Sequence, residues 1–307
     1  MSYKNPVVDI AMPDPTVIKA ADGYFYVYAT ESTRNVPIMK SKDLVEWTYC
    51  NTAFTNKTRP RFEPKAGIWA PDINYINGKY VLYYAMSVWG GEQTCGIGVA
   101  TANSPQGPFT DHGKMFRSNE IGVQNSIDPS LLQYEGRNYL VWGSFRGIYV
   151  IELTADGLSI MSGAKKKRIA GTAFEAVYIH KHGDYYYMFA SIGSCCQGVK
   201  STYKVVVGRS KKVWGPYKDK TGKPMLKNGY SLVIGANDHF VGNGHGSQII
   251  QDDAGQDWLL YHGFSRSTPE NGRILLLDQI KWDQEGWPYV EGGSPSYETQ
   301  KAPVFNN

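Results

Sequence analysis

The sequence predicts an all-β fold, and three observations carry this prediction. Short runs of alternating apolar and polar residues recur along the chain between Gly, Pro, Asn and Asp, which is typical of strands joined by turns. Aromatic residues make up 13% of the chain and include 22 Tyr and 8 Trp, which strands favour. Helical periodicity is nowhere sustained for about 11 residues.

One short pattern recurs five times and divides the chain into repeats. Each copy is a polar or ionisable residue followed by an apolar run: PDPTVI (13–18), PDINYI (71–76), IDPSLL (127–132), FEAVYI (174–179) and GHGSQI (244–249). Alignment on the apolar residue four places further on gives five equivalent positions: Asp14, Asp72, Asp128, Glu175 and His245. Successive openings lie 47 to 70 positions apart, which is near the ~40–50 residues of known propeller blades with loops added.

Each repeat offers its strands in the same order. The first follows the opening, the second is rich in aromatics (24–30, 79–86, 138–145, 185–191 and 258–264), and the third comes after it (36–41, 96–102, 147–153, 204–210 and 273–280). Asp-Gly at 22–23 and Asn-Gly at 77–78 are strong hairpin signals between the first two strands.

Five such sheets arranged radially make a five-bladed β-propeller, which we expect to be a single domain over residues 1–307 with blades opening near 14, 72, 128, 175 and 245. A β-sandwich is the alternative, but it gives no reason for a fivefold repeat. First strands line the central channel of a propeller, so the five equivalent residues should converge at one end of the axis. We expect residues 1–10 and the stretch beyond Gly286 to meet and close the ring, which removes exposed sheet edges.

Composition narrows the functional classes. The formal net charge is +4 and is spread along the chain, so no nucleic-acid or membrane footprint is indicated, and we expect a monomer. The four Cys, at 50, 95, 195 and 196, lack the spacing of a zinc site or a redox motif. Adjacent cysteines rarely pair with each other, so we expect mostly free thiols. The first ten residues lack the apolar core of a signal peptide.

Three carboxylates around one cavity, with aromatics nearby, suit the cleavage of a glycosidic bond. One group must protonate the leaving oxygen while another activates water or attacks carbon directly. Glu175 has the longer reach and follows Phe174 in an apolar context, which suits the acid. Asp14 and Asp128 each precede a Pro and suit a base and a neighbour that raises the pKa of the acid through like-charge repulsion.

Two positions of the ring stay open on the residues alone. Asp72 has either a structural role or a substrate contact. His245 lies between two glycines, which leave its backbone open to approach, so it either binds a metal on the axis or forms hydrogen bonds within the channel. We favour the metal.

The motifs MPDPTVI, WAPDI, NSIDPSLL, FEAVYI and GNGHGSQI together resemble glycoside hydrolase family 43, and GSCCQG, STYKVVVGRS and GPY resemble its arabinanase branch. The resemblance spans roughly residues 5–290. It implies hydrolysis of α-1,5-linked arabinan with inversion, with Asp14 as general base, Glu175 as general acid, and Asp128 raising the pKa of the acid and orienting it. It also implies that His245, with water molecules, holds a calcium ion on the axis.

The resemblance further implies substrate contacts by Trp69, which matches an aromatic packed against the sugar, and less directly by Asn125 and Ser144. Inversion requires the base and acid carboxyls to stand ~6.5–9.5 Å apart. We expect endo action, and the loops 88–95, 117–126, 194–203 and 228–243 would decide between endo and exo cutting. Exo-arabinanase, α-arabinofuranosidase and β-xylosidase activity stay open, as does a sugar-binding propeller without catalysis.

The expected partner is arabinan or arabino-oligosaccharide. We expect a secreted or periplasmic location, with a leader that is not part of this chain, and a cytoplasmic location stays open.

Overall fold

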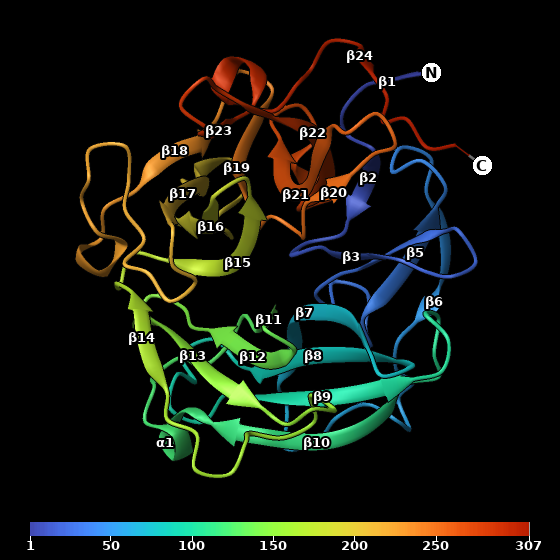
Figure 1. The fold of residues 1–307 in the computed structure, drawn as a ribbon. Coiled ribbons are helices and arrows are strands. Elements are labelled where there is room, and N and C mark those ends of the chain that lie inside the picture. The colour runs from blue at the N-terminus through green and yellow to red at the C-terminus, as the bar shows by residue number, and fades with distance from the viewer. Residues whose placement is uncertain (307) are drawn as a thin grey trace.

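The computed structural model describes residues 1–306 and forms five sheets around a central axis (Figure 1). Each sheet is one blade, and its strands run antiparallel from the axis outward. The strands of the first four blades, from the inside out, are β3 (Thr16–Lys19), β4 (Phe25–Tyr28), β5 (Pro37–Ser41) and β6 (Thr48–Thr52); β7 (Gly67–Ile76), β8 (Lys79–Ser87), β9 (Gly96–Ala102) and β10 (Thr110–Arg117); β11 (Ser130–Tyr134), β12 (Arg137–Trp142), β13 (Ile148–Leu153) and β14 (Lys167–Ala170); and β15 (Glu175–His182), β16 (Tyr185–Ile192), β17 (Lys204–Ser210) and β18 (Ser231–Ile234).

The fifth blade joins the two ends of the chain. It comprises β19 (Phe240–Gly244), β20 (Ile250–Gln251), β21 (Asp257–Ser265), β22 (Ile274–Trp282) and β23 (Pro288–Tyr289), with β2 (Val8–Ala11) from the N-terminus as a further strand on β22. In addition, β1 (Ser2–Tyr3) pairs with β24 (Gln300–Lys301). The termini lie close together in Figure 1, and the predicted closure of the ring is confirmed.

The five-bladed prediction is confirmed, with three corrections at the inner strands. Asp72 lies inside β7, at a bulge after Trp69, because that strand begins earlier than the motif suggests. The inner strand of the fifth blade precedes His245 and resumes only at β20. A left-handed backbone conformation is shared by Asp14, Asp128, His245 and Ala176, so Glu175 comes one residue before the position equivalent to the others.

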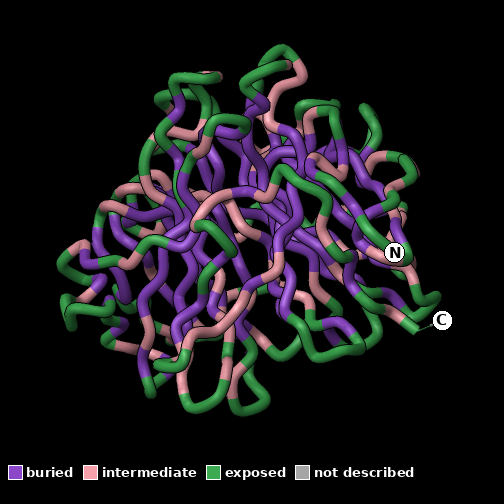
Figure 2. The backbone as a smooth tube through the Cα atoms, turned by 90° about the horizontal axis from the view of Figure 1, so that it is seen from above, coloured by how far each residue is buried: buried purple, intermediate pink, exposed green. Residues whose placement is uncertain are grey.

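The hydrophobic core consists of five clusters, one between each pair of adjacent blades. The cluster between the first two blades contains Tyr26 and Tyr28 from β4 and Tyr80 and Tyr84 from β8. Similar clusters lie at the other four contacts between blades. Middle strands are therefore buried on both faces, which explains why the second strands read as nearly continuous apolar runs. Figure 2 shows the buried segments in the interior and the exposed ones mainly in loops at the periphery.

Aromatic residues serve this packing because they fill the wide spaces between blades and satisfy their own polar atoms. Tyr83 donates its hydroxyl hydrogen to the carbonyl of Gly157 at 2.8 Å, and Trp142 donates to Ser126 at 3.0 Å. Buried Tyr and Trp usually find such a partner.

Helical structure is confined to short connections. These are α1 (Ser118–Ile121) and the 3-10 turns η1 (Gly198–Lys200), η2 (Met225–Lys227), η3 (Pro269–Asn271) and η4 (Glu291–Gly293). Over residues 1–306, no helix has the length and apolar character needed to cross a membrane.

Candidate active site

A cleft of about 780 Å³ opens at one end of the propeller axis. Successive strands of a blade are antiparallel, so the first and third strands begin at this end of the axis and the second strand ends there. The cleft is therefore built from residues of every blade: Asp14, Thr30, Glu31, Ser32, Trp69, Ser87, Val88, Trp89, Gly90, Glu92, Asn125, Ile127, Asp128, Ser144, Phe145, Glu175, Gly193, Ser194, Cys195, Cys196, Gln197, His245 and Arg273.

Asp14 is a buried carboxylate held in its ionised form. One oxygen, Oδ1, lies 2.9 Å from the Arg273 guanidinium and 3.1 Å from Nδ1 of His245. The other oxygen accepts a hydrogen bond from the Thr30 hydroxyl at 2.7 Å. Burial opposes ionisation, but Arg273 and His245 hold the pKa of Asp14 well below its usual range. A carboxylate that keeps its charge at neutral pH can accept a proton from water.

His262 fixes the backbone of Asp14 without adding charge. Its Nδ1 accepts the Asp14 amide hydrogen at 3.0 Å, and burial lowers its pKa to about 4. The ring stacks on Tyr203 with centroids 5.6 Å apart. Together these contacts hold Asp14 in the left-handed conformation, with φ of 54°, that few residues other than glycine adopt.

Glu175 is the second buried carboxyl of the cleft, and its environment is the opposite of that of Asp14. No Lys or Arg lies within 4.0 Å of it in the described chain. It accepts hydrogen bonds from the Ser144 hydroxyl on Oε2 and the Tyr203 hydroxyl on Oε1, both at 2.6 Å. Burial raises the pKa of Glu175, and the two hydroxyls offset that rise only in part. This carboxyl is suited to carry a proton.

Asp128 is hydrogen-bonded to the backbone directly after Glu175. Its Oδ2 accepts the amide hydrogen of Ala176, the residue after Glu175, at 3.0 Å. Burial and the negative charge of Glu175 raise the pKa of Asp128, although His245 opposes this. The two carboxyls therefore do not ionise independently, and ionisation of one raises the pKa of the other.

Asp72 lies apart from these three acids. It lines a small cavity of about 20 Å³ on the axis, below the cleft, and is not part of the cleft wall. Its oxygens accept hydrogen bonds from Asn74 at 2.6 Å, from Gln248 at 2.8 Å and from the Leu131 amide at 2.9 Å. The structure thus favours the structural alternative for Asp72 over a substrate contact, because its acceptor sites are used to join blades.

The remaining predicted contacts are distributed differently. Trp69 lines the cleft beside the exposed Trp89, with ring centroids 6.2 Å apart. Ser144 reaches the cleft, but its hydroxyl is directed at Glu175, and Asn125 donates to that hydroxyl at 3.0 Å. Asn125 and Ser144 therefore form a chain of hydrogen bonds that ends on the candidate acid.

The expectation about the thiols is wrong for the adjacent pair. Cys195 and Cys196 form a disulfide in the cleft wall, whereas Cys50 and Cys95 are free. The pair lies in the loop that carries Gly193 to Gln197 into the cleft.

Two other carboxylates line the cleft but are committed to cations. Glu31 contacts Arg59 through both oxygens, at 2.7 and 3.0 Å, and also accepts the Ile68 amide. Glu92 contacts Arg146 at 3.0 Å in the same wall. Neither has the isolated, buried environment of Glu175.

Four residues of the site were missed by sequence reasoning: Thr30, Tyr203, His262 and Arg273. A positional signal existed for two of them, because Tyr203 and Arg273 immediately precede the third strands β17 and β22. Those starts point to the same end of the axis as the five openings. The structure also explains the glycine before His245, because a Cβ on Gly244 would clash with the Tyr203 ring.

His245 lies between the cleft and the axial cavity and lines both. Burial opposes protonation, but the carboxylate of Asp14 and those of Asp128 and Glu175 raise the pKa of His245 to about 9. Among residues 1–306, it belongs to no group of three His, Cys, Asp or Glu side chains whose ligand atoms all lie within 4.8 Å. An imidazole binds a cation only in its neutral form, so a cation held by His245, with most of its other ligands from water, would have to displace this ring proton.

Comparison with known proteins agrees with this arrangement. The chain is 36% identical over 306 residues to an extracellular exo-α-(1→5)-L-arabinofuranosidase, ArbA, of Cellvibrio japonicus, covering 91% of this chain and 86% of that protein. It is 36% identical over 289 residues to extracellular endo-α-(1→5)-L-arabinanase 1 of Bacillus subtilis, covering 90% and 86%. The structure of Cellvibrio cellulosa α-L-arabinanase complexed with arabinohexaose superposes with a TM-score of 0.83 at 33% identity, over 92% of this chain and 96% of that one.

The family profile described as Glycosyl hydrolases family 43 matches residues 3–288, which include every residue of the cleft. With this match and relatives above 30% identity over most of both chains, the protein belongs to glycosyl hydrolase family 43.

Proposed function

We propose that the protein hydrolyses α-1,5-linked L-arabinan with inversion at the anomeric carbon. One observation carries the proposal: two buried carboxyls in a single cleft have opposite environments, since Arg273 and His245 lower the pKa of Asp14 whereas burial raises the pKa of Glu175. A pair of titratable groups whose pKa values are driven apart is the arrangement that assigns a base and an acid.

In this reaction Asp14 accepts a proton from a water molecule while the oxygen of that water attacks the anomeric carbon. The bond from that carbon to the glycosidic oxygen breaks, and Glu175 gives its proton to the leaving oxygen. Asp128 accepts the Ala176 amide hydrogen, and ionisation of either Asp128 or Glu175 opposes ionisation of the other, which favours retention of a proton by the pair. Ser144 and Tyr203 fix the two oxygens of Glu175.

The choice of substrate is supported by the relatives, two of which act on α-(1→5)-arabinosyl linkages by their descriptions. Trp69 and the neighbouring Trp89 supply the aromatic surface against which a sugar ring can pack. A cleft of about 780 Å³ is in the size range that holds a ligand of several rings. We favour endo action on this ground.

Exo action is the second candidate, because the Cellvibrio relative described as an exo enzyme is as similar to this chain as the Bacillus endo enzyme. Of the four loops named above, 88–95 and 194–203 contribute several cleft residues, 117–126 contributes Asn125, and 228–243 contributes none. The first two loops are therefore the places to look for a wall that closes one end.

We also propose that His245 holds a calcium ion on the axis through one ring nitrogen, with water molecules as the other ligands. Asp14 and Asp128 nearby supply the negative charge that favours a cation there. When bound, the ion would add positive charge next to the carboxylate that accepts the proton.

We also propose a location outside the cytoplasm, because both relatives are described as extracellular. Fractionation of the native host, with immunodetection of the protein in medium, periplasm and cytoplasm, tests this proposal.

The decisive experiment measures reducing ends released from linear arabinan by the wild type, by Glu175→Gln and by Glu152→Gln. Glu175→Gln should lose about 10²–10⁴ in kcat, the usual contribution of a positioned acid. Glu152 is a carboxylate of β13 outside the cleft, so its variant should match the wild type. Equal rates for Glu175→Gln and the wild type would overturn the catalytic assignment of Glu175, and release of no reducing ends by the wild type would leave only a sugar-binding role.

The same assay separates the two modes of cutting. A ladder of oligosaccharides in the first minutes indicates endo action, and one product alone indicates exo action. The anomeric configuration of the first product, read by proton NMR before mutarotation, tests inversion: a product that retains the configuration of the substrate contradicts the role of Asp14 as base.

A further inference from the structure

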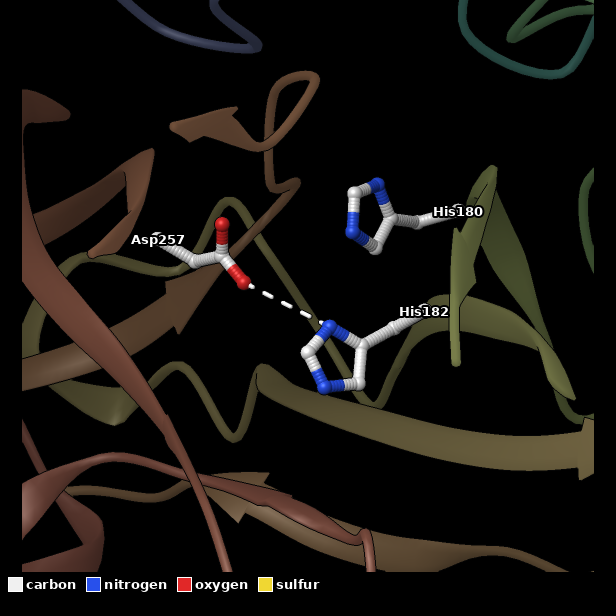
Figure 3. A group of neighbouring side chains, drawn as sticks. All are labelled: His180, His182 and Asp257. Atoms are coloured by element: carbon white, nitrogen blue, oxygen red, sulfur yellow. Dashed lines mark ion pairs between the residues drawn. The ribbon is translucent and has the colours of Figure 1, made fainter. Parts of the chain in front are cut away.

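Three side chains far from the cleft face one another between the fourth and fifth blades (Figure 3). His180 and His182 come from the inner strand β15, and Asp257 is the first residue of β21. Residues two apart on a strand point to the same face, so the regular end of β15 presents both imidazoles toward the neighbouring blade. Ligand atoms of all three residues lie within 4.8 Å of one another.

Asp257 is the unusual member of this group. It is only 4% exposed, and its one basic neighbour within 4.0 Å is His182, whose Nδ1 lies 3.8 Å from Oδ2. Arg and Lys side chains are not among its partners in the described chain. Buried carboxylates are ordinarily paired or bound to a metal, and a histidine at this distance is a weak partner.

The carboxylate is nevertheless held firmly. Trp282 donates its ring hydrogen to Oδ2 at 2.8 Å, and Gln251 donates to Oδ1 at 3.2 Å. His182 in turn stacks on the Trp282 ring, with centroids 3.7 Å apart and planes within 5°. Metal ligands are commonly oriented by such surrounding contacts, and the two oxygens retain further acceptor capacity.

The imidazoles are available as ligands. In the described structure no hydrogen bond uses a ring nitrogen of His180 or His182, and the one carboxylate within 4.0 Å of the His182 ring nitrogens is that of Asp257. Neither ring is fully enclosed, because both residues are partly exposed, which leaves a path for an ion from solvent. We infer that His180, His182 and Asp257 form a binding site for one divalent transition ion, for which Zn²⁺ is the best match.

The donor set decides the class of ion. Two nitrogens and one carboxylate oxygen suit zinc, whereas Ca²⁺ prefers ~6–8 oxygens. Tetrahedral zinc with bonds of about 2.0–2.1 Å places its ligand atoms about 3.4 Å apart. The three side chains therefore need to close by little more than 1 Å, with a water molecule as the fourth ligand.

The site is separate from the hydrolytic cleft. His180 is five residues from Glu175 along β15, and Asp257 is five residues from His262 along β21. At about 3.3 Å per residue, β15 places the site about 16 Å from Glu175, and β21 places it about as far from His262. The ion would tie the fourth blade to the fifth, and its effect should be on stability rather than on hydrolysis.

The test uses the full chain, freed of metal by a chelator and dialysed into excess Ca²⁺ so that any calcium site is filled. Titration with Zn²⁺ by calorimetry should give one site per chain, and the melting temperature should rise with Zn²⁺ concentration. His180→Gln and His182→Gln should each weaken zinc at least tenfold. His112→Gln, which changes an exposed histidine of β10, should bind zinc as the wild type does.

Two further measurements keep the result clear. Trp282→Phe removes the hydrogen bond to Asp257 but keeps an aromatic ring, and should weaken zinc about 10–100-fold. Co²⁺ should give the visible spectrum of a tetrahedral nitrogen and oxygen site. Absence of stoichiometric zinc binding, or unchanged zinc binding in the His180→Gln/His182→Gln double variant, would overturn the inference whether or not the protein hydrolyses arabinan.

Discussion

Replacing Tyr203 by Phe tests the electrostatic account of the acid most directly. The Tyr203 hydroxyl donates to Oε1 of Glu175 at 2.6 Å and lowers the pKa of that carboxyl, against the larger effect of burial. Phe keeps the ring that stacks on His262 and removes only the donor. The pKa of Glu175 should therefore rise further above its usual value.

The size of the shift follows from the worth of the lost hydrogen bond. A hydrogen bond to a charged group contributes about 1.5–3 kcal/mol, and about 1.4 kcal/mol corresponds to one pKa unit. The hydroxyl also bonds the neutral acid, though more weakly, so we expect the lower end: a rise of about one unit. Because Asp128 titrates with Glu175, this is a shift of the pair.

The assay is the pH profile of kcat/KM on linear arabinan, whose alkaline limb reports the acid in the free enzyme. That limb should move up by about one unit in Tyr203→Phe. Tyr217→Phe, which removes a buried phenol bonded to the Val213 carbonyl in the same blade, should leave it in place. An alkaline limb that is unmoved, or that moves to lower pH, would refute Glu175 as the proton donor.

Four further predictions follow from the same contacts. Arg273→Met removes the cation 2.9 Å from Asp14, so the depressed pKa of Asp14 should rise. The acidic limb of the pH profile of kcat/KM should then move to higher pH, and an unmoved limb contradicts Asp14 as base. Ionised Asp14 stabilises the fold above its unfolded pKa of about 3.9, and this stabilisation is lost as the pH falls through its lower folded pKa. Arg273→Met should reduce this contribution, so the free energy of urea unfolding should depend less on pH in acid than it does in the wild type. Asp72→Asn places an NH₂ group against groups that donate hydrogen bonds to Asp72, such as the Leu131 amide. The free energy of urea unfolding should therefore fall by about 1–3 kcal/mol while KM stays unchanged. A raised KM would restore Asp72 as a substrate contact. Trp69→Ala should raise KM about 10–100-fold with a smaller change in kcat, from the ~1.5–3 kcal/mol of a buried aromatic surface. Chelation should lower both activity and melting temperature, with recovery on adding Ca²⁺, and no change in either would remove the support for an axial ion.

The catalytic candidates were within reach of the sequence because the fold repeats. Five polar residues at equivalent places in five repeats must approach one axis, whatever the loops do, so Asp14, Asp128 and Glu175 could be brought together before any coordinates. The aromatic second strands were equally readable, since burial on both faces leaves no polar alternation.

The exact inner positions were less readable. A single apolar pattern does not reveal where a strand bulges, and this is why Asp72 was placed at a strand start and Glu175 one residue out of step. The pairing of Cys195 with Cys196 depends on the conformation of the loop that carries them, which residue type alone does not predict.

The sequence by itself determined the number of blades, the all-β class and the three acids, because these depend on periodicity within one chain. The tertiary structure decided in which direction the pKa of each acid shifts. Arg273 lies 259 residues from Asp14 and Tyr203 lies 28 residues from Glu175 in sequence, yet each contacts its carboxyl directly. A pKa is set by burial and by neighbours in space, and those neighbours exist only once the ring has closed.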